Sequence, residues 1–278
     1  MMRRWAGAGL LLALAGVAAA QQASHVVAQP LIAAHRGGAA LWPENSLTAF
    51  RGAIALGVDA LEFDVHLTAD GEPVVIHDAT LDRTTTGQGP VRSVTLARLQ
   101  SVRLLDRTGA PLDETVPTLA QVLALARPTS VAVLPEIKLD RSRAPYPDVE
   151  QRVVALLRAH GLVERASVQS FDDATLRRVR ALEPALRTML LISQGRMTTY
   201  ASTPADPVRW AVELGTADLG VDFRLIDAPL VAAARAAGVR LAAWTVNADD
   251  DLRRMGALGV DVVMSDRPDR ARQLLVQR

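Results

Sequence analysis

The fold is decided by a stretch that reads Ala-Phe-Arg-Gly-Ala-Ile-Ala-Leu-Gly-Val-Asp-Ala-Leu-Glu-Phe at residues 49–63. Its first half is rich in alanine and leucine, which favours a helix, and Gly57 suits the left-handed conformation that ends one. The apolar run after Gly57 is typical of a strand that is covered on both faces. The same order returns at residues 153–169, 231–244 and 249–264. Alternation of helix and buried strand predicts a parallel sheet with helical crossovers.

Eight apolar runs are candidates for parallel strands. They lie at residues 31–34, 61–65, 131–136, 167–169, 187–191, 219–222, 241–245 and 262–264. A further short strand at 73–76 follows the turn at Asp70-Gly71 and is expected to fold back as a hairpin. Eight units without an internal linker predict an α/β fold, a closed (β/α)₈ barrel, rather than an open doubly wound sheet.

Residues 79–116 interrupt this alternation with a segment rich in Thr, Gly, Arg and Asp. We interpret it as a small insertion after the second barrel strand that lies over the barrel mouth. Residues 21–278 are then expected to form a single domain. Thr118 is predicted to cap the next helix, with Gln121 as the other member of a capping box.

The first twenty residues have the order of a secretory signal. Residues 1–4 carry two arginines, residues 5–17 are apolar, and three alanines at 18–20 precede Gln21. The apolar run is too short for a stable membrane span, although a retained anchor is the alternative. We therefore expect an exported protein, periplasmic or secreted, with no stable membrane anchor.

The composition excludes several classes of protein. The sequence has no cysteine, so disulfides, thiolate metal sites and cysteine nucleophiles are ruled out. Its 31 basic residues nearly balance 30 acidic ones, and no basic stripe is present. A nucleic-acid partner is therefore not expected.

Three carboxylates lie on predicted strands. Glu62 and Asp64 are two residues apart, so both side chains point to one face, and Glu136 ends another apolar run. Like charges in a buried site are unfavourable unless a cation compensates them. Oxygen ligands without cysteine favour one divalent cation, Ca²⁺ or Mg²⁺, with Ca²⁺ preferred for an exported protein. The alternative is a set of surface salt-bridge acids.

Two histidines follow apolar runs, each beside a charged neighbour. His35 precedes Arg36, and His77 precedes Asp78. Imidazole titrates near neutrality and serves as a general acid or base, so this pair is a candidate for acid–base catalysis rather than structure. The Arg36 guanidinium has a shape matched to phosphate oxygens. His66 shares the strand face of the two carboxylates and is a weaker, outer candidate.

Two further residues are candidates for binding substrate. Lys138 lies two residues beyond Glu136 and is the only lysine of the chain, which suggests a specific role. Trp244 ends a predicted strand, where its ring either packs against a small polyol or belongs to the core. Asn45 is expected to serve the structure, and the role of Glu44 is left open.

These motifs, in this order, resemble the glycerophosphodiester phosphodiesterase family, specifically its exported type. They are His35-Arg36-Gly37, Pro43-Glu44-Asn45, Glu62-Phe63-Asp64, His77-Asp78, Glu136-Ile137-Lys138, Gln169-Ser170-Phe171, Trp244-Thr245-Val246-Asn247 and Ser265-Asp266-Arg267-Pro268. The resemblance covers residues 31 to about 275.

The resemblance implies a TIM barrel with its site at the carboxyl ends of the strands. It implies that His35 and His77 are the acid–base pair, that Glu62, Asp64 and Glu136 bind the metal, and that Arg36 and Lys138 contact phosphate. The implied reaction is hydrolysis of deacylated phospholipids to glycerol 3-phosphate and an alcohol. Water attacks phosphorus directly, or the glycerol 2-hydroxyl attacks first and gives a cyclic phosphate; the sequence leaves both routes open.

Two other functions remain alternatives. A phospholipase D-like or phosphoinositide-cleaving lipase on the same barrel is expected to expose apolar residues around the mouth. A non-catalytic phosphodiester-binding protein would have no use for an acid–base pair.

Overall fold

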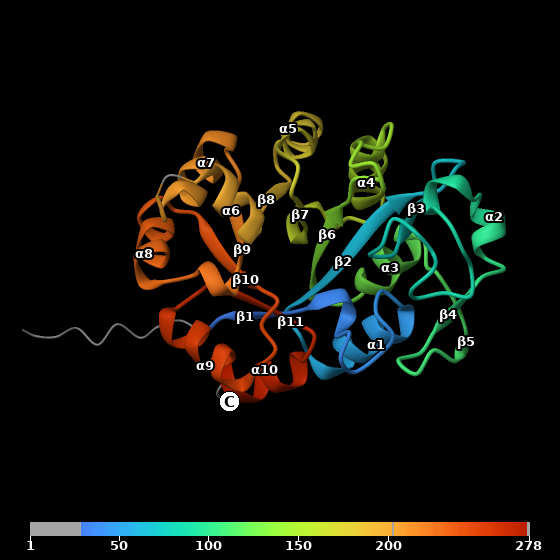
Figure 1. Ribbon diagram of the computed structural model, residues 1–278, viewed down its shortest axis with the longest axis horizontal. Coiled ribbons are helices and arrows are strands. Elements are labelled where there is room, and N and C mark those ends of the chain that lie inside the picture. Colours follow the sequence, from blue (N-terminus) through green and yellow to red (C-terminus); the bar gives the residue numbers. More distant parts are fainter. Residues whose placement is uncertain (1–28, 202, 277–278) are drawn as a thin grey trace, which may run out of the picture.

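The computed structural model describes residues 29–201 and 203–276, so the predicted signal segment lies outside the described residues. Eight parallel strands form a ring in the order β1-β11-β10-β9-β8-β7-β6-β2, and pairing of β1 with β2 closes it (Figure 1). The strands are β1 (Leu31–Ala34), β2 (Ala60–Leu67), β6 (Ala132–Ile137), β7 (Ser167–Ser170), β8 (Arg187–Ile192), β9 (Asp218–Asp222), β10 (Arg240–Trp244) and β11 (Val262–Ser265). The predicted closed barrel is confirmed.

Helices surround the ring and cover its outer face (Figure 1). They are α1 (Leu47–Leu56), α3 (Leu119–Ala126), α4 (Val149–Ala159), α5 (Asp173–Leu182), α6 (Gln194–Tyr200), α7 (Asp206–Leu214), α8 (Ala228–Ala236), α9 (Asp249–Leu258) and α10 (Pro268–Leu275). Thr118 and Gln121 form the predicted capping box of α3. Among the described residues, no helix is long and apolar enough to cross a membrane.

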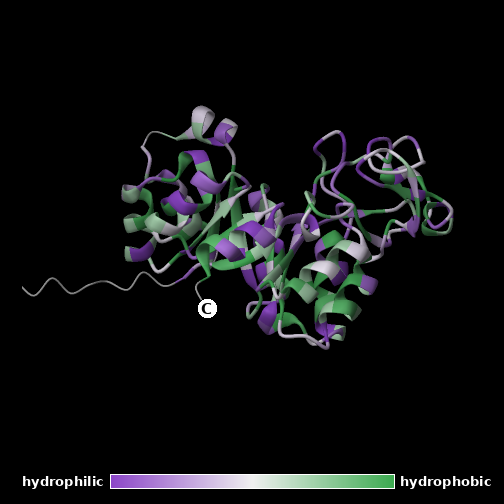
Figure 2. Ribbon diagram, turned by 90° about the horizontal axis from the view of Figure 1, so that it is seen from below, coloured by the Kyte–Doolittle hydropathy of each residue, from purple (hydrophilic) through white to green (hydrophobic). Residues whose placement is uncertain are grey.

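The alternation of side chains along β2 separates two environments. Leu61, Phe63 and Val65 pack outward against the helices in a large core cluster. Glu62 and Asp64 have the opposite parity and point into the barrel, as predicted. Figure 2 shows the same division over the molecule, with hydrophobic residues along the strands and hydrophilic residues on outer helix faces.

The segment between β2 and α3 folds against one side of the barrel, beyond β2 (Figure 1). β3 (Pro73–Val75) pairs antiparallel with β2, so the predicted hairpin is confirmed. Residues 79–116 hold a short α2 (Leu96–Leu99) and a two-stranded sheet of β4 (Arg103–Leu105) and β5 (Pro111–Thr115). A small core of its own, which includes Leu81, Leu99 and Leu104, fixes this insertion in place.

Candidate active site

The candidate residues gather at the carboxyl ends of the barrel strands, where barrel enzymes place their sites. A cavity of about 120 Å³ is lined by residues from several different strands. Its lining includes His35, Arg36, Glu62, His77, Glu136, Lys138, Gln169 and Trp244. Asp64 lies against the same group through its contact with Lys138, whose Nζ is 3.3 Å from Asp64 Oδ1. The structure therefore brings together the eight residues predicted for the site, which are His35, Arg36, Glu62, Asp64, His77, Glu136, Lys138 and Trp244.

A left-handed turn after β1 aims Arg36 at the acids. Arg36 has φ 52° and Gly37 φ 80°, and a Cβ on Gly37 would lie 2.8 Å from the Cβ of Ala49. Glycine is therefore required at residue 37 for the chain to pass so close to α1. In this turn the backbone N–H of Arg36 donates to Glu62 Oε2 at 2.9 Å.

The three carboxylates form a cluster suited to a cation. One oxygen of each of Glu62, Asp64 and Glu136 lies within 4.8 Å of the others, and all three side chains are buried. Burial, together with the two neighbouring carboxylates, raises the pKa of Glu62 to about 7. An all-oxygen donor set with mutual repulsion fits Ca²⁺ or Mg²⁺.

Neighbouring amides hold two of these carboxylates in position. Asn45 donates to Asp64 at 2.9 Å, and Gln169 donates to Glu62 at 2.8 Å. Lys138 lies 2.8 Å from Glu136 and compensates part of the negative charge. Burial alone would raise the pKa of Asp64, but Lys138 and Arg36 hold it below its ordinary value. Asn45 therefore has the structural role that was expected, and the side chain that it positions, Asp64, is a candidate metal ligand.

The His35 ring is fixed from behind by Asp266. His35 Nδ1 lies 2.6 Å from Asp266 Oδ1, and Asn247 donates to the other oxygen of Asp266 at 2.7 Å. His35 Nε2 points into the site, 3.9 Å from Glu62. Burial alone would lower the pKa of His35, but Glu62 and Asp266 outweigh it and raise the pKa above its ordinary value.

The His77 ring is fixed in the same way by its neighbour Asp78. His77 Nδ1 lies 2.7 Å from Asp78 Oδ1, and His66 Nε2 contacts the carbonyl oxygen of His77 at 3.1 Å. Burial lowers the pKa of His77, with the cationic Lys138 and Arg36 acting in the same direction. Both imidazoles therefore keep Nδ1 on an aspartate and leave Nε2 available for substrate.

Arg83 of the insertion connects Asp78, which holds His77, to Glu44, which contacts Arg36. Its guanidinium donates to Asp78 at 2.7 and 3.0 Å and to Glu44 at 2.8 Å twice. Glu44 in turn accepts from Arg36 at 3.2 Å. The role left open for Glu44 is thus a link between Arg36 and Arg83.

Sequence reasoning missed the parts played by Asp266, Arg83 and Gln169. Asp266 and Gln169 stand in motifs already noted, at the ends of β11 and β7, and that position was the available signal. Nothing in the local pattern singled out Arg83 among the many arginines of the chain.

Two buried polar atoms on uncharged side chains of this cavity have no hydrogen-bond partner within the described part of the chain. They are Gln169 Oε1 and the indole Nε1 of Trp244. The Trp244 ring also packs edge-on against Phe171, with centroids 5.6 Å apart. Buried polar groups normally have partners, so these two atoms are suited to hydroxyls of a bound molecule.

A (β/α)₈ barrel that carries two oriented imidazoles, two cationic side chains and an acidic cluster able to hold a metal ion at its carboxyl end is typical of a hydrolase of the phosphate-cleaving class. The model of the glycerophosphoryl diester phosphodiesterase family matches residues 35–270. The chain belongs to this family.

Individual relatives agree with that assignment. A glycerophosphodiester phosphodiesterase of Caldanaerobacter subterraneus is 34% identical over 86% of this chain and 95% of its own length. One of Bacillus subtilis is 31% identical over 86% of this chain and 84% of its own length. An Oleispira antarctica phosphodiesterase, solved in complex with the product sn-glycerol-3-phosphate, has a TM-score of 0.75 at 26% identity and covers 90% of this chain and 98% of its own.

Proposed function

We propose that this protein hydrolyses glycerophosphodiesters, the deacylated phospholipids, to glycerol 3-phosphate and a free alcohol. The observation that carries the proposal is a cluster of three buried carboxylates beside a small cavity that also holds two imidazoles, each held by an aspartate. A relative of similar fold binds the product sn-glycerol-3-phosphate. A non-catalytic binding role would leave the paired imidazoles without a purpose.

The cofactor in this proposal is one divalent cation, with Ca²⁺ preferred over Mg²⁺. Glu62, Asp64 and Glu136 would hold it, since their oxygens converge and the donor set is that of a hard cation. Bound there, the cation neutralises phosphate charge and acts as a Lewis acid.

The chain's own residues divide the remaining work. Arg36 and Lys138 bind the phosphate oxygens, and the Trp244 indole and the Gln169 carbonyl bind hydroxyls of the glycerol half. His35 lies between Asp266 and Glu62, which favour its protonated form, and so gives a proton to the leaving alcohol. Burial lowers the pKa of His77, with Lys138 and Arg36 acting in the same direction, so His77 takes the proton of the attacking hydroxyl.

Two routes of attack fit this assignment. We favour the glycerol 2-hydroxyl as first nucleophile, followed by opening of a cyclic phosphate by water with the two imidazoles in exchanged roles. A diester that lacks the 2-hydroxyl is then bound but cleaved very slowly. Equal turnover of that analogue would establish direct attack by water and leave the residue assignments intact.

We further propose that the protein is exported. Residues 1–20 support this because they combine a basic start, an apolar run and three alanines. Expression of the full chain, followed by amino-terminal sequencing of the protein recovered outside the cytoplasm, tests the proposal. A start near residue 21 is expected, and an uncleaved chain retained in the membrane would overturn it.

The activity is tested by incubating the purified protein with a panel of glycerophosphodiesters in Ca²⁺ or Mg²⁺. Release of glycerol 3-phosphate and free alcohol, followed enzymatically and by ³¹P NMR, is the expected result. The His35→Ala/His77→Ala double variant is the control. Tight retention of the diester without turnover would instead identify a binding protein.

A further inference from the structure

A groove much larger than the catalytic cavity opens beside it. It measures about 1040 Å³, against about 120 Å³ for the cavity, and the two share Glu136, Lys138 and Phe171. The small cavity is below the usual size of a pocket that encloses a whole ligand, whereas the groove lies at the upper end of that range. Any substrate larger than its phosphate and glycerol parts therefore has a lined path to follow from the scissile bond.

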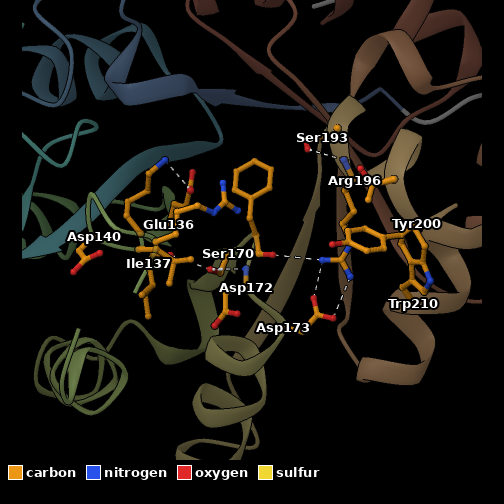
Figure 3. Close-up of a pocket in the computed structure, with 16 residues that line it drawn as sticks. Glu136, Ile137, Asp140, Ser170, Asp172, Asp173, Ser193, Arg196, Tyr200 and Trp210 are labelled. Carbon is orange, nitrogen blue, oxygen red and sulfur yellow. Dashed lines mark hydrogen bonds and ion pairs between the residues drawn. The ribbon is translucent and has the colours of Figure 1, made fainter. Parts of the chain in front are cut away.

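The groove lies over the ends of β6, β7 and β8, and its far wall comes from α6 and α7 (Figure 3). Arg196 reaches from α6 to Asp173 and holds both carboxylate oxygens, at 2.8 and 3.1 Å. The same guanidinium lies 5.0 Å from the ring centroid of Trp210. This bidentate pair connects the start of α5 to α6 and gives the groove a fixed wall.

The acids of the groove are already matched by cationic or N–H groups. Asp140 pairs with Arg92, Asp173 pairs with Arg196, and Glu136 pairs with Lys138. Asp172 lies 3.8 Å from Arg178 and accepts from the backbone N–H of Thr175 at 2.8 Å. Arg143, by contrast, is exposed in the groove and makes no ion pair with any residue that the structure describes. The charge left available to a ligand is therefore positive.

Aromatic rings supply the apolar surface of the groove. Phe171 is 37% exposed at the catalytic end, and Tyr200 is 72% exposed at the far end. The Trp210 face is already covered by Arg196. Phe171 and Tyr200 therefore offer exposed rings, but a quaternary ammonium group would meet the unpaired Arg143 guanidinium with no unmatched acid among the described residues of the groove to offset it.

We infer that the groove is a subsite for the leaving alcohol and that it takes hydroxyl-rich alcohols, of the inositol or glycerol type, in preference to choline or ethanolamine. This inference rests on the proposed phosphodiesterase activity. Guanidinium groups donate to ring or chain hydroxyls, the carboxylates and serine hydroxyls accept from them, and the exposed rings pack against C–H faces.

The test compares kcat and KM for two diesters that differ only in the alcohol, glycerophosphoinositol and glycerophosphocholine. The wild type is expected to favour the inositol diester by about tenfold in kcat/KM, the value of one or two added hydrogen bonds to charged groups. Arg143→Ala and Tyr200→Ala should each remove most of that preference, through KM. Turnover of the choline diester should change less than about twofold in both variants.

Arg209→Ala is the matched control, since Arg209 is an exposed arginine beside Trp210 in sequence but outside the groove. It should leave both diesters unaffected. Equal kcat/KM for the two diesters in the wild type, or equal losses for both in the groove variants, would overturn the inference while leaving the phosphodiesterase activity standing. Failure of the wild type to cleave either diester would instead overturn the proposed function.

Discussion

Both ends of the barrel contain buried carboxylates, but the two ends differ in how far neighbouring groups compensate the negative charge. At the amino ends of β7 to β10, Asp218 is fully buried and is surrounded by donors from three neighbouring strands. Arg240 donates to it at 2.8 and 3.0 Å, and Ser167 donates at 2.7 Å. Arg187 adds a further ion pair. At the carboxyl ends, three acids share Lys138, Arg36 and two side-chain amides.

The difference is visible in the pKa of the acids. Burial would raise the pKa of Asp218, but hydrogen bonds from Arg187 and Arg240 hold it below its ordinary value. Glu62 is equally buried and keeps a raised pKa of about 7. Buried charge that the protein compensates itself is structural, whereas buried charge left uncompensated awaits a ligand.

Removal of divalent cations should have the largest effect on activity. EDTA should abolish turnover, and Ca²⁺ or Mg²⁺ should restore it, because the acidic cluster lacks sufficient positive charge of its own. Glu62→Gln should weaken metal affinity, measured by isothermal titration calorimetry, more than it weakens folding. Full activity in buffer shown by elemental analysis to contain no metal would remove the distinction between the two barrel ends.

Loss of an imidazole should come next. His35→Ala and His77→Ala should each lower kcat by at least about a hundredfold, the usual contribution of a general acid or base. Thermal unfolding should change little, because both rings are at the site and not in the core. A variant with near-native turnover would exclude that histidine from the mechanism.

The sequence predicted one end of the barrel far better than the other. The eight strands and the site acids follow from local patterns, namely a glycine after several of the helices and charged residues toward strand ends. Asp218 is held by residues of neighbouring strands as far as 51 positions away in sequence. Arg83 acts on Glu44, 39 positions away. Such partners depend on register and loop path, which no local pattern specifies.

Asp218→Asn should destabilise the amino end of the barrel without affecting the site at its carboxyl end. The variant leaves two arginines without their shared carboxylate, and we expect a loss of about 3 kcal/mol in the free energy of unfolding. Urea denaturation measures it, with Asp113→Asn as control, because Asp113 is 98% exposed in its pair with Arg103. The kcat of Asp218→Asn should stay within about twofold of the wild type. A large fall in kcat would mean that the two ends are coupled.

The wild type and Asp218→Asn should also differ in how their stability depends on pH. The pKa of Asp218 is lower in the folded state than in the unfolded chain, so its stabilising contribution is present above the unfolded value of about 3.9. That contribution is lost as the pH falls below this value toward the folded pKa. The stability gap between wild type and Asp218→Asn should therefore be constant near neutrality and narrow below pH ~4. A stability difference that widens in acid would show that the pKa of Asp218 is raised, and not lowered, in the folded state.

The smallest effect is expected where the insertion meets the site. Arg83→Ala should lower kcat by about fivefold, because Asp78 and Glu44 lose the group that aligns them behind His77 and Arg36. Arg103→Ala is a close control, because both arginines belong to the insertion and both side chains are 48% exposed. Among the described residues, however, Arg103 forms an ion pair with Asp113 alone and with no residue of the site. If Arg83 acts through Asp78, the losses from Arg83→Ala and Asp78→Asn are not additive in a double-mutant cycle. Losses that multiply independently, with the melting temperature lowered in step, would show that Arg83 only stabilises the insertion.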